Sequence, residues 1–411
     1  MTVHIVKAVI RAAFSGLTAM SLNIGYAGLV IMFLSASLTQ AETTLSGSFK
    51  VKSYSSKNFT GDDSGDWDKA AVFQETVLNF NSPLSDSFTL TGGVIFSGHW
   101  GESDTIGQFG TDYVGMNTDT LFATITHGNW ELRLGKQQYD MANGLLYSEK
   151  LTGASGSYFA DSWAITAIAI DTDSHITHDL FGLKGEYHPN PFVSIFPYCL
   201  LASGSGRREY YPGIDINFKT DTSESWFTLI RQLGYVDIAD RHFTHDGCLS
   251  VFEHVRFTEF GNIRTEWIYA TGGTEENTIK AFQGTVGQSY PWSEIMGLGD
   301  LDFGASYGAP GEYLTNIRAV NVGGSYILKN GFQTDIDLWY ARLNEERIPE
   351  APDWYNGKEL GFEIDVKLTY TLAESMKAEM IFAYLFAGNA TCNRGNKENP
   401  YEAGLILSVE F

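Results

Sequence analysis

The sequence predicts an all-β fold, a transmembrane antiparallel up-and-down β-barrel with 18 strands, or 16 as the alternative. Three observations lead to this fold class. Long segments after residue 42 alternate between apolar and polar residues, which is the two-residue period of a β-strand. The composition combines 43 glycines and 14% aromatic residues with only 18% charged residues, as suits a barrel wall in lipid. The last alternating segment runs to the aromatic Phe411.

The N-terminal segment has the layout of a secretory signal peptide. Lys7 and Arg11 precede an apolar stretch over residues 12–38, and small residues lead to Ala41. Positive, apolar and then small residues are typical of a cleaved leader. We therefore expect a signal peptide at residues 1–41 and an outer-membrane barrel at 42–411, with an uncleaved anchor as the alternative.

The predicted strands form one opening strand, eight hairpins and one closing strand. An even count, with short turns within hairpins and longer connections between them, is typical of single-chain bacterial barrels. This arrangement places both termini on the periplasmic side. The expected ranges are 43–54, 70–81 with 87–98, 118–127 with 130–138, 151–159 with 162–172, 178–188 with 191–203, 211–219 with 225–236, 245–256 with 261–273, 313–328 with 331–343, 357–371 with 375–388, and 400–411.

The clearest alternation lies in the last fifty-odd residues. In the segment 359–370, one face carries apolar residues from Leu360 to Tyr370, and the other carries Glu363, Asp365 and Lys367. An apolar face opposite a charged face indicates lipid on one side of the wall and water on the other.

Charge and cysteine content exclude several classes of function. The net charge is −22, and loss of a leader with two basic and no acidic residues would make it −24, which argues against nucleic acid as a partner. Cys199, Cys248 and Cys392 are far apart and form no C-x-x-C motif, so we expect no haem, zinc or other cofactor. Residues 240–246 form a predicted loop that contains His242 and His245, a weak candidate for a metal or acid–base pair.

The predicted lumen carries charges of both signs. A barrel of about 16–18 strands encloses water, so charged residues that alternate with apolar ones are candidates to line a pore. The basic candidates are Lys50, Lys52, Arg133, Lys184, Arg256, Arg264 and Lys367. The acidic candidates are Glu75, Glu131, Glu186, Asp215, Glu266, Asp335, Asp337, Glu363, Asp365 and Glu379.

The longest connection, Thr274–Glu312, is a candidate constriction loop. Long loops tend to be functional or disordered, so the alternatives are an inward fold that narrows the pore and a solvated surface loop. The constriction candidates are its acidic residues Glu275, Glu276, Glu294, Asp300 and Asp302.

A second acidic loop follows the first strand. Its carboxylates could offer oxygen ligands to Ca²⁺, but their spacing does not match an EF-hand loop, so we expect no metal site. These weak candidates are Asp62, Asp63, Asp66 and Asp68.

Three segments resemble the alginate-export family of bacterial outer-membrane porins. They are the C-terminal hairpin with K-E-L-G-F-E-I-D-V-K-L-T-Y at 358–370, L-R-L-G-K-Q at 132–137 and N-V-G-G-S-Y at 321–326. The resemblance implies an 18-stranded porin, in agreement with the strand count. The mixed lumen charges differ from the arginine- and lysine-rich pore that suits alginate, so the expectation stops at a porin.

The expected function is passive diffusion of small hydrophilic solutes or saccharides through a water-filled channel in the outer membrane of a Gram-negative bacterium. No nucleophile motif or metalloprotease motif occurs, so we expect no enzyme. An outer-membrane barrel enzyme, or a conduit or scaffold that holds a periplasmic partner, remains as an alternative. Expected partners are outer-membrane lipids, lipopolysaccharide, small hydrophilic solutes and the barrel-assembly machinery, which would read Phe411.

Overall fold

The computed structural model describes eleven segments of the chain. The predicted signal peptide, the acidic loop with Asp62, Asp63, Asp66 and Asp68, Asp302 and Cys392 lie outside them. The described segments are 43–57, 69–100, 115–171, 178–238, 241–285, 288–297, 299–301, 314–328, 331–346, 357–391 and 398–411.

The described residues form twenty strands and one short 3-10 helix, η1 (Ala142–Gly144). No helix in this part of the chain is long and apolar enough to span a membrane. The strands are β1 (Thr44–Lys57), β2 (Lys69–Ser85), β3 (Phe88–Trp100), β4 (Gly115–His127), β5 (Trp130–Met141), β6 (Tyr147–Phe159), β7 (Trp163–Ile170), β8 (His178–Asn190), β9 (Val193–Gly204), β10 (Arg207–Lys219), β11 (Ser223–Ile238), β12 (Arg241–Thr258), β13 (Gly261–Ala270), β14 (Thr274–Glu275), β15 (Thr278–Ile279), β16 (Ile317–Ile327), β17 (Phe332–Leu343), β18 (Glu359–Ala373), β19 (Met376–Ala387) and β20 (Tyr401–Glu410).

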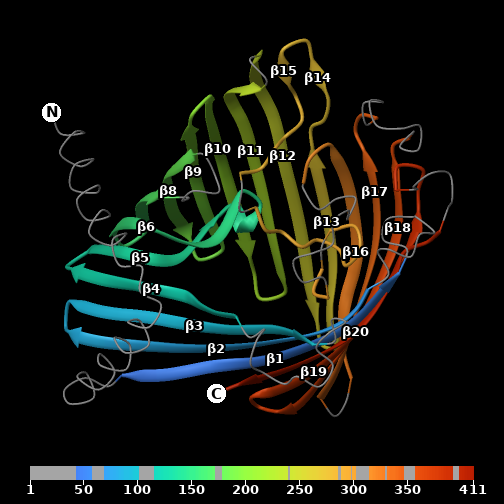
Figure 1. Cartoon of the computed structure of the whole chain (residues 1–411), viewed down its shortest axis with the longest axis horizontal. Helices are drawn as coiled ribbons and strands as arrows, with labels where there is room; N and C mark the ends of the chain where they lie inside the picture. The colour runs from blue at the N-terminus through green and yellow to red at the C-terminus, as the bar shows by residue number, and fades with distance from the viewer. Residues whose placement is uncertain are drawn as a thin grey trace.

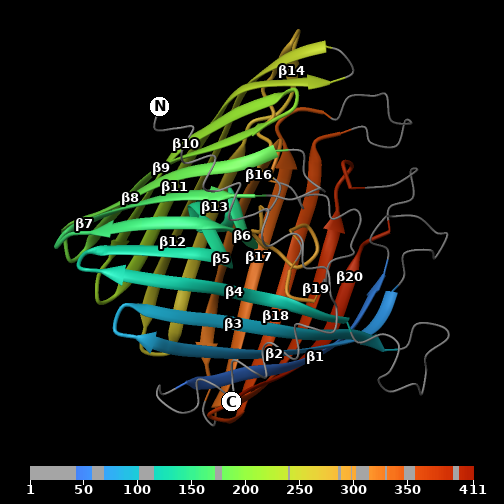
Figure 2. The ribbon, with the colours of Figure 1, turned by 60° about the vertical axis from the view of Figure 1, so that its left-hand side comes forward.

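The strands close into an antiparallel barrel. Each wall strand pairs with its neighbour along the chain, β13 pairs with β16, and β20 pairs with β1 from Ser48↔Glu410 to Lys57↔Tyr401. The remaining two strands, β14 and β15, form a small hairpin whose second strand makes a short parallel pairing with β12. Among the described residues the wall therefore has 18 strands, which confirms the predicted count (Figures 1 and 2).

Short turns join the strands at one end of the barrel, near the predicted positions. For example, β4 and β5 are joined by Gly128 and Asn129, where the φ of Gly128 is 55°, a conformation that glycine adopts without strain. The loop predicted at residues 240–246 is wrong: residues 241–246 belong to β12, and they pair with β11 from Ile238↔Arg241 onward.

The outer face of the wall is apolar. In β19, Met380, Phe382 and Phe386 are exposed, whereas the alternate residues Ile381 and Leu385 are buried inside. The same alternation continues around the barrel, as expected for a wall in lipid. Other exposed apolar residues include Leu78, Leu121, Leu132, Leu183, Phe252, Trp267, Val322, Leu338, Leu368 and Leu405.

Leu360 departs from this alternation. It was predicted on the outer face with Phe362, but it is fully buried in the core. The pairing of β17 with β18 shifts register between Ala341 and Arg342, and Gly361 has a φ of 136°. This bulge turns the side chain of Leu360 to the other face, because one extra residue reverses the alternation.

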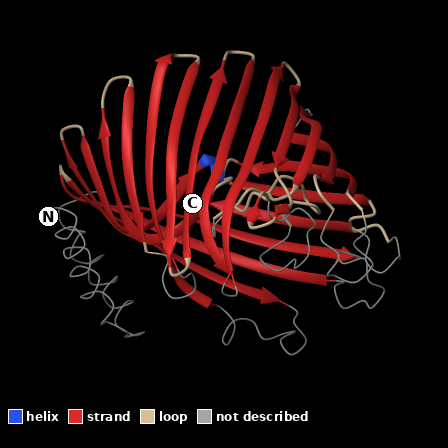
Figure 3. Ribbon diagram, turned by 90° about the horizontal axis from the view of Figure 1, so that it is seen from above, coloured by secondary structure: helices blue, strands red, loops and turns tan. Residues whose placement is uncertain are grey.

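The hydrophobic core lies inside the barrel. Phe282, Trp292, Ile295 and Met296 come from the connection between β15 and β16, which we call the inward loop (residues 280–301). They pack with residues that follow η1 and with the inner faces of β5–β13 and β16–β19. Figure 3 shows loop segments and η1 within the ring of strands. Among the described residues, the cluster takes none from β1–β4, so the core fills one side of the lumen.

Candidate functional site in the lumen

Glu363 on β18 fixes the middle of the inward loop to the wall. Its carboxylate is fully buried and accepts hydrogen bonds from the N–H groups of Ile295 (2.7 Å) and Met296 (2.9 Å). Beside it, the rings of Trp292 and Trp339 pack edge to face with centroids 4.9 Å apart. Charge-assisted hydrogen bonds to a buried carboxylate are strong, so this contact holds the loop against β17 and β18.

The start of the inward loop is attached to other strands. Gln232 on β11 accepts the N–H of Gln283 at 2.7 Å, and the hydroxyl of Tyr211 on β10 donates to the Gln283 carbonyl at 3.3 Å. Thr285 and Gln288 donate to the backbone carbonyls of the residues that follow η1, at 2.5 and 2.6 Å. The loop therefore crosses the lumen, with contacts to β10 and β11 at one end and to β17 and β18 at the other.

Gly144 of η1 lies directly against the loop. Its carbonyl accepts the N–H of Ser289 at 3.1 Å. A Cβ at this position would lie 2.3 Å from the Ser289 carbonyl oxygen, and the φ of Gly144 is 86°. Only glycine suits both conditions.

An ion pair and a hydrogen bond attach the end of the loop to β18 and β1. Asp300 pairs with Lys367 of β18 at 2.8 Å, and Lys367 also pairs with Glu379 of β19 at 3.0 Å. Lys52 of β1 donates a hydrogen bond to the carbonyl of Asp300. Burial alone would raise the pKa of Asp300, but its hydrogen bond and ion pair with Lys367, with help from Lys52, bring that pKa below its ordinary value.

Glu294 closes a turn within the loop. Its carboxylate accepts the N–H groups of Asp300 (3.1 Å) and Leu301 (3.3 Å), and its own N–H donates to Asp365 at 3.4 Å. Burial, together with the negative charge of Asp300, raises the pKa of Glu294 to about 7. Glu294 therefore changes charge near neutral pH.

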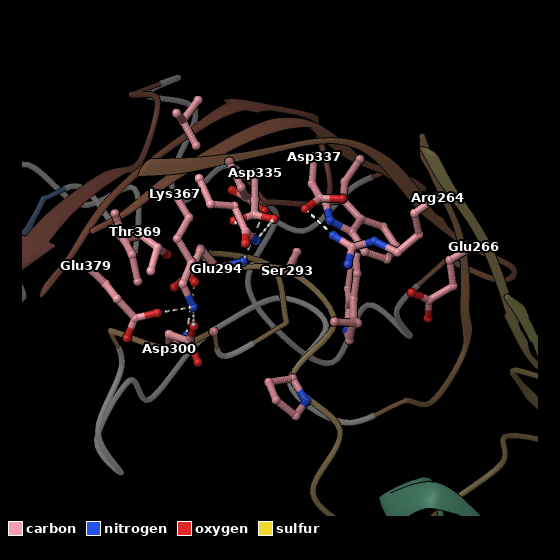
Figure 4. Close-up of a pocket in the computed structure, with 18 of the residues that line it drawn as sticks. Arg264, Glu266, Ser293, Glu294, Asp300, Asp335, Asp337, Lys367, Thr369 and Glu379 are labelled. Carbon is pink, nitrogen blue, oxygen red and sulfur yellow. Dashed lines mark hydrogen bonds and ion pairs between the residues drawn. The ribbon is translucent and has the colours of Figure 1, made fainter. Parts of the chain in front are cut away.

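The loop and the wall enclose a cavity of about 710 Å³ (Figure 4), which we call the acidic cavity. Arg264 on β13 forms an ion pair with Asp337 on β17, and the hydroxyl of Tyr290 donates to Glu266 at 2.7 Å. Eight carboxylates line the cavity against three cations, so it is electronegative. The carboxylates are Glu253, Glu266, Glu294, Asp300, Asp335, Asp337, Asp365 and Glu379, and the cations are Arg264, Lys367 and Lys377.

The strand pairings place the predicted lumen residues on the inner face, with one exception. Arg256 is exposed and lies directly opposite Ile263, an exposed apolar residue of the outer face. Placing Arg256 in the pore was wrong. β12 is apolar on both faces because Leu249 and Val251 pack under the loop, so polarity along this strand does not distinguish inside from outside. The residues on the inner face are Lys50, Lys52, Glu75, Glu131, Arg133, Lys184, Glu186, Asp215, Arg264, Glu266, Asp335, Asp337, Glu363, Asp365, Lys367 and Glu379.

Several of these inward residues are buried and do not face open water. Glu363 is covered by the loop, and Asp215 is held by Thr228 (2.7 Å) and by the Tyr198 hydroxyl (3.2 Å). Lys52 is also buried. Strand alternation thus shows which charged residues point inward, but whether such a residue contacts water depends on whether the inward loop covers it.

The predicted constriction residues separate into two groups. Glu294 and Asp300 lie inside the barrel, in the contacts described above. Glu275 and Glu276 instead belong to the β14–β15 hairpin beside β12, and the Glu275 side chain is 76% exposed while it pairs with Lys280 at 3.3 Å. Their expected place in a constriction was wrong because this hairpin extends from the rim, as Figure 1 shows.

The two candidate histidines do not form a site. His242 is exposed and pairs with Asp237 at 2.8 Å, whereas the buried His245 lies 3.1 Å from Glu209. Three positions apart on one strand, they point to opposite faces. In the described part of the chain, no group of three or more histidine, cysteine or acidic side chains is arranged to hold a metal ion.

Sequence reasoning missed several residues of the acidic cavity. Glu253 lies directly opposite Glu266 in the β12–β13 hairpin, and the register around the short turn after Thr258 could have revealed this pair. Tyr290 and Trp292 carried no recognisable signal, because a loop has no periodicity that shows which residues it buries. Trp339 lies on β17 on the same face as Asp335 and Asp337, so the alternation of that strand could have revealed it.

Comparisons with known proteins support the fold. No protein-family model and no curated protein match the sequence. Among solved structures, OccAB2 of Acinetobacter baumannii has a TM-score of 0.62 at 13% identity, over 90% of this chain and 98% of the other. OccK8 (OprE) of Pseudomonas aeruginosa has a TM-score of 0.60 at 11% identity, over 90% and 98% of the two chains. The outer membrane protein OpdK of the same organism has a TM-score of 0.60 at 13% identity, over 90% and 99%.

Proposed function

We propose that this protein is an outer-membrane porin through which small hydrophilic solutes diffuse passively. The observation that carries the proposal is the closed 18-strand wall with an apolar outer face and a charged interior, crossed by a loop anchored at both ends. One of the proteins of similar fold, OpdK, is an outer membrane protein. Such a barrel is wide enough for an aqueous lumen, and no chemical step is required of it.

The proposed route avoids the hydrophobic core. Among the described residues, the inner faces of β1–β4 contribute nothing to that core, but β1 contacts the end of the inward loop through Lys52. We therefore place the passage between β2–β4 and the inward loop. It would continue past the acidic cavity, where Glu294 and Asp300 act as constriction residues. The excess of carboxylates there favours cations.

The setting of the channel follows from the same proposal. The chain would be exported by a cleaved signal peptide at residues 1–41 and inserted into the outer membrane of a Gram-negative bacterium. Its partners would be outer-membrane lipids, lipopolysaccharide and the barrel-assembly machinery, which would read Phe411. In the structure Phe411 is tied to β1, since its N–H donates to the Gly47 carbonyl at 3.0 Å.

Alginate is not part of the proposal. The resemblance to alginate-export porins concerns segments of the wall, and neither the sequence comparisons nor the structures named above support it. The acidic cavity would repel a polyanion. The solute class is therefore better sought among neutral or cationic molecules.

Planar-bilayer recording tests the proposal. The refolded full chain should give stepwise ohmic conductance, and its reversal potential in a KCl gradient should show a preference for K⁺ over Cl⁻. A barrel that inserts but stays electrically silent would refute the porin function. Strong selectivity for chloride would refute the proposed route past the acidic cavity.

A further inference from the structure

Two carboxylates face each other across the β12–β13 hairpin inside the acidic cavity. Glu253 and Glu266 are directly opposite in the antiparallel register, and both line the cavity. Like charges at directly opposed positions destabilise a sheet. The fold therefore holds a repulsive pair at a place where side chains meet a solvent-filled space.

Neutral donors satisfy these carboxylates only in part. The indole N–H of Trp226 donates to Glu253, and the Tyr290 hydroxyl donates to Oε1 of Glu266. Arg264, two positions from Glu266 on the same inner face, is engaged by Asp337. Within the described segments neither glutamate takes part in an ion pair, although residue Glu266 is only 7% exposed. A buried carboxylate without a cation is costly.

A second pair of like charges lies in the same cavity. Asp337 and Asp365 are directly opposed in the β17–β18 register. Arg264 compensates Asp337, but the buried Oδ1 of Asp365 has no hydrogen-bond partner. Two independent registers thus place carboxylates in opposition around one cavity. Of the three cations that line it, Arg264 is paired with Asp337, and Lys367 is paired with Asp300 and Glu379, so the eight carboxylates remain in excess.

We propose that the acidic cavity is a binding station for the cationic head of a small organic solute, an ammonium or a guanidinium group. Glu253 and Glu266 would receive its N–H donors, and Tyr290 and Trp292, which also line the cavity, would pack against its carbon atoms. Aromatic rings attract organic cations as well as apolar groups, whereas a small inorganic ion would gain only the charge. This inference rests on the proposed channel, because solute must reach the cavity through the lumen.

Single-channel block by benzylammonium tests the station. Benzyl alcohol and benzoate have the same ring without the positive charge and serve as matched probes. The test variant is Glu253→Gln with Glu266→Gln, since glutamine can still accept the hydrogen bonds from Trp226 and Tyr290. The control variant is Glu186→Gln, which removes an inner-face carboxylate that pairs with His188 and does not line the cavity.

Benzylammonium should interrupt the K⁺ current of the unaltered protein, and the two matched probes should not. In the test variant its half-blocking concentration should rise at least about tenfold, the usual effect of losing charge-assisted hydrogen bonds. The control should change by less than about twofold. Equal block in the test variant, or equal block by benzyl alcohol, would overturn the proposal. The proposal would also be overturned if the test variant lost its preference for K⁺ but was still blocked by benzylammonium at the same concentration.

A failure of the channel function can be separated from a failure of the station. Tryptophan fluorescence of the refolded protein in detergent reports on Trp292 and Trp226 beside the cavity. A silent barrel whose fluorescence still titrates with benzylammonium, and loses that response in the double variant, would refute the porin and keep the station. A conducting barrel with no fluorescence response and no block by benzylammonium would support the porin function and refute the binding station.

Discussion

At the scale of single residues, the Glu363 carboxylate has a role that its position in a polar strand face does not show. It points into the barrel, as the alternation in β18 predicts, but it accepts two backbone N–H groups of the inward loop and meets no solvent. Its neighbours Asp365 and Lys367 face the cavity. Consecutive inward positions of one strand thus separate into an anchor and two residues of the cavity wall.

Replacement of this anchor should release the loop. In Glu363→Ala, two buried backbone N–H groups lose a charged acceptor, which should weaken loop docking by about 3 kcal/mol. Glu363→Gln should lose less, because its amide oxygen still accepts one hydrogen bond. Limited proteolysis of the refolded barrel measures the effect as faster cleavage within residues 288–297.

The matched control is Glu131→Ala, a change of an inner-face glutamate that pairs with Arg133 on β5 and does not touch the loop. Its cleavage rate should equal that of the unaltered protein. If Glu363→Ala were cleaved no faster than this control, the carboxylate would not be holding the loop.

At the scale of elements, the inward loop combines anchoring contacts with a group that titrates near neutrality. The Glu294 carboxylate accepts hydrogen bonds from two backbone N–H groups, and burial beside Asp300 raises its pKa to about 7. The charged side chains that face it are Asp300 from the loop, Asp365 and Glu363 from β18, and Lys52 from β1. Three of these four groups are acidic, so protonation of Glu294 relieves repulsion.

This raised pKa predicts two effects of opposite direction. The folded protein holds a proton on Glu294 between pH 4.5 and about 7 that the unfolded chain releases, so loop docking is strongest below this window. Stability falls, by up to about 1.4 kcal/mol per unit, as the pH rises through it. The preference for K⁺ should increase over the same range because the cavity gains a negative charge.

Reversal potentials in a KCl gradient at pH 5.5 and 8.5 measure the second effect, and proteolysis of the loop measures the first. Glu294→Gln should remove this step from both profiles, since its side chain does not titrate. A variant whose pH profile matches that of the unaltered protein would assign the titration to another group.

The elements differ in how far sequence could predict them. Wall strands were predictable because lipid outside and polar groups inside impose a period of two, as in β19 and β20. For the inward loop, the sequence did not distinguish an inward fold from a solvated surface loop. The contact of Gln283 with Gln232 joins positions 51 residues apart, so no local sequence pattern reveals it. The prediction that Arg256 lines the pore was wrong for a related reason. The core under the loop makes both faces of β12 apolar, so the alternation along this strand does not show which face points inward.

At the scale of the whole molecule, the outer face of the barrel is a continuous apolar surface. Val322 lies at the middle of β16 and is 53% exposed, and Leu328 is exposed just beyond the end of the same strand. In a membrane, the first would lie near the centre of the bilayer and the second near an interface. The two positions therefore report on whether this belt meets hydrocarbon.

An arginine at each position should give very different costs. Val322→Arg should lower the free energy of unfolding in lipid vesicles by about 2–4 kcal/mol, and Leu328→Arg by about 0–1, because the cost of a charge depends on its depth in the bilayer. Guanidinium titration followed by tryptophan fluorescence measures both. In detergent micelles, whose apolar region is less ordered, we expect a smaller difference. Equal costs in vesicles would mean that the middle of β16 does not face the bilayer core, and the wall would then have another environment than the one its exterior indicates.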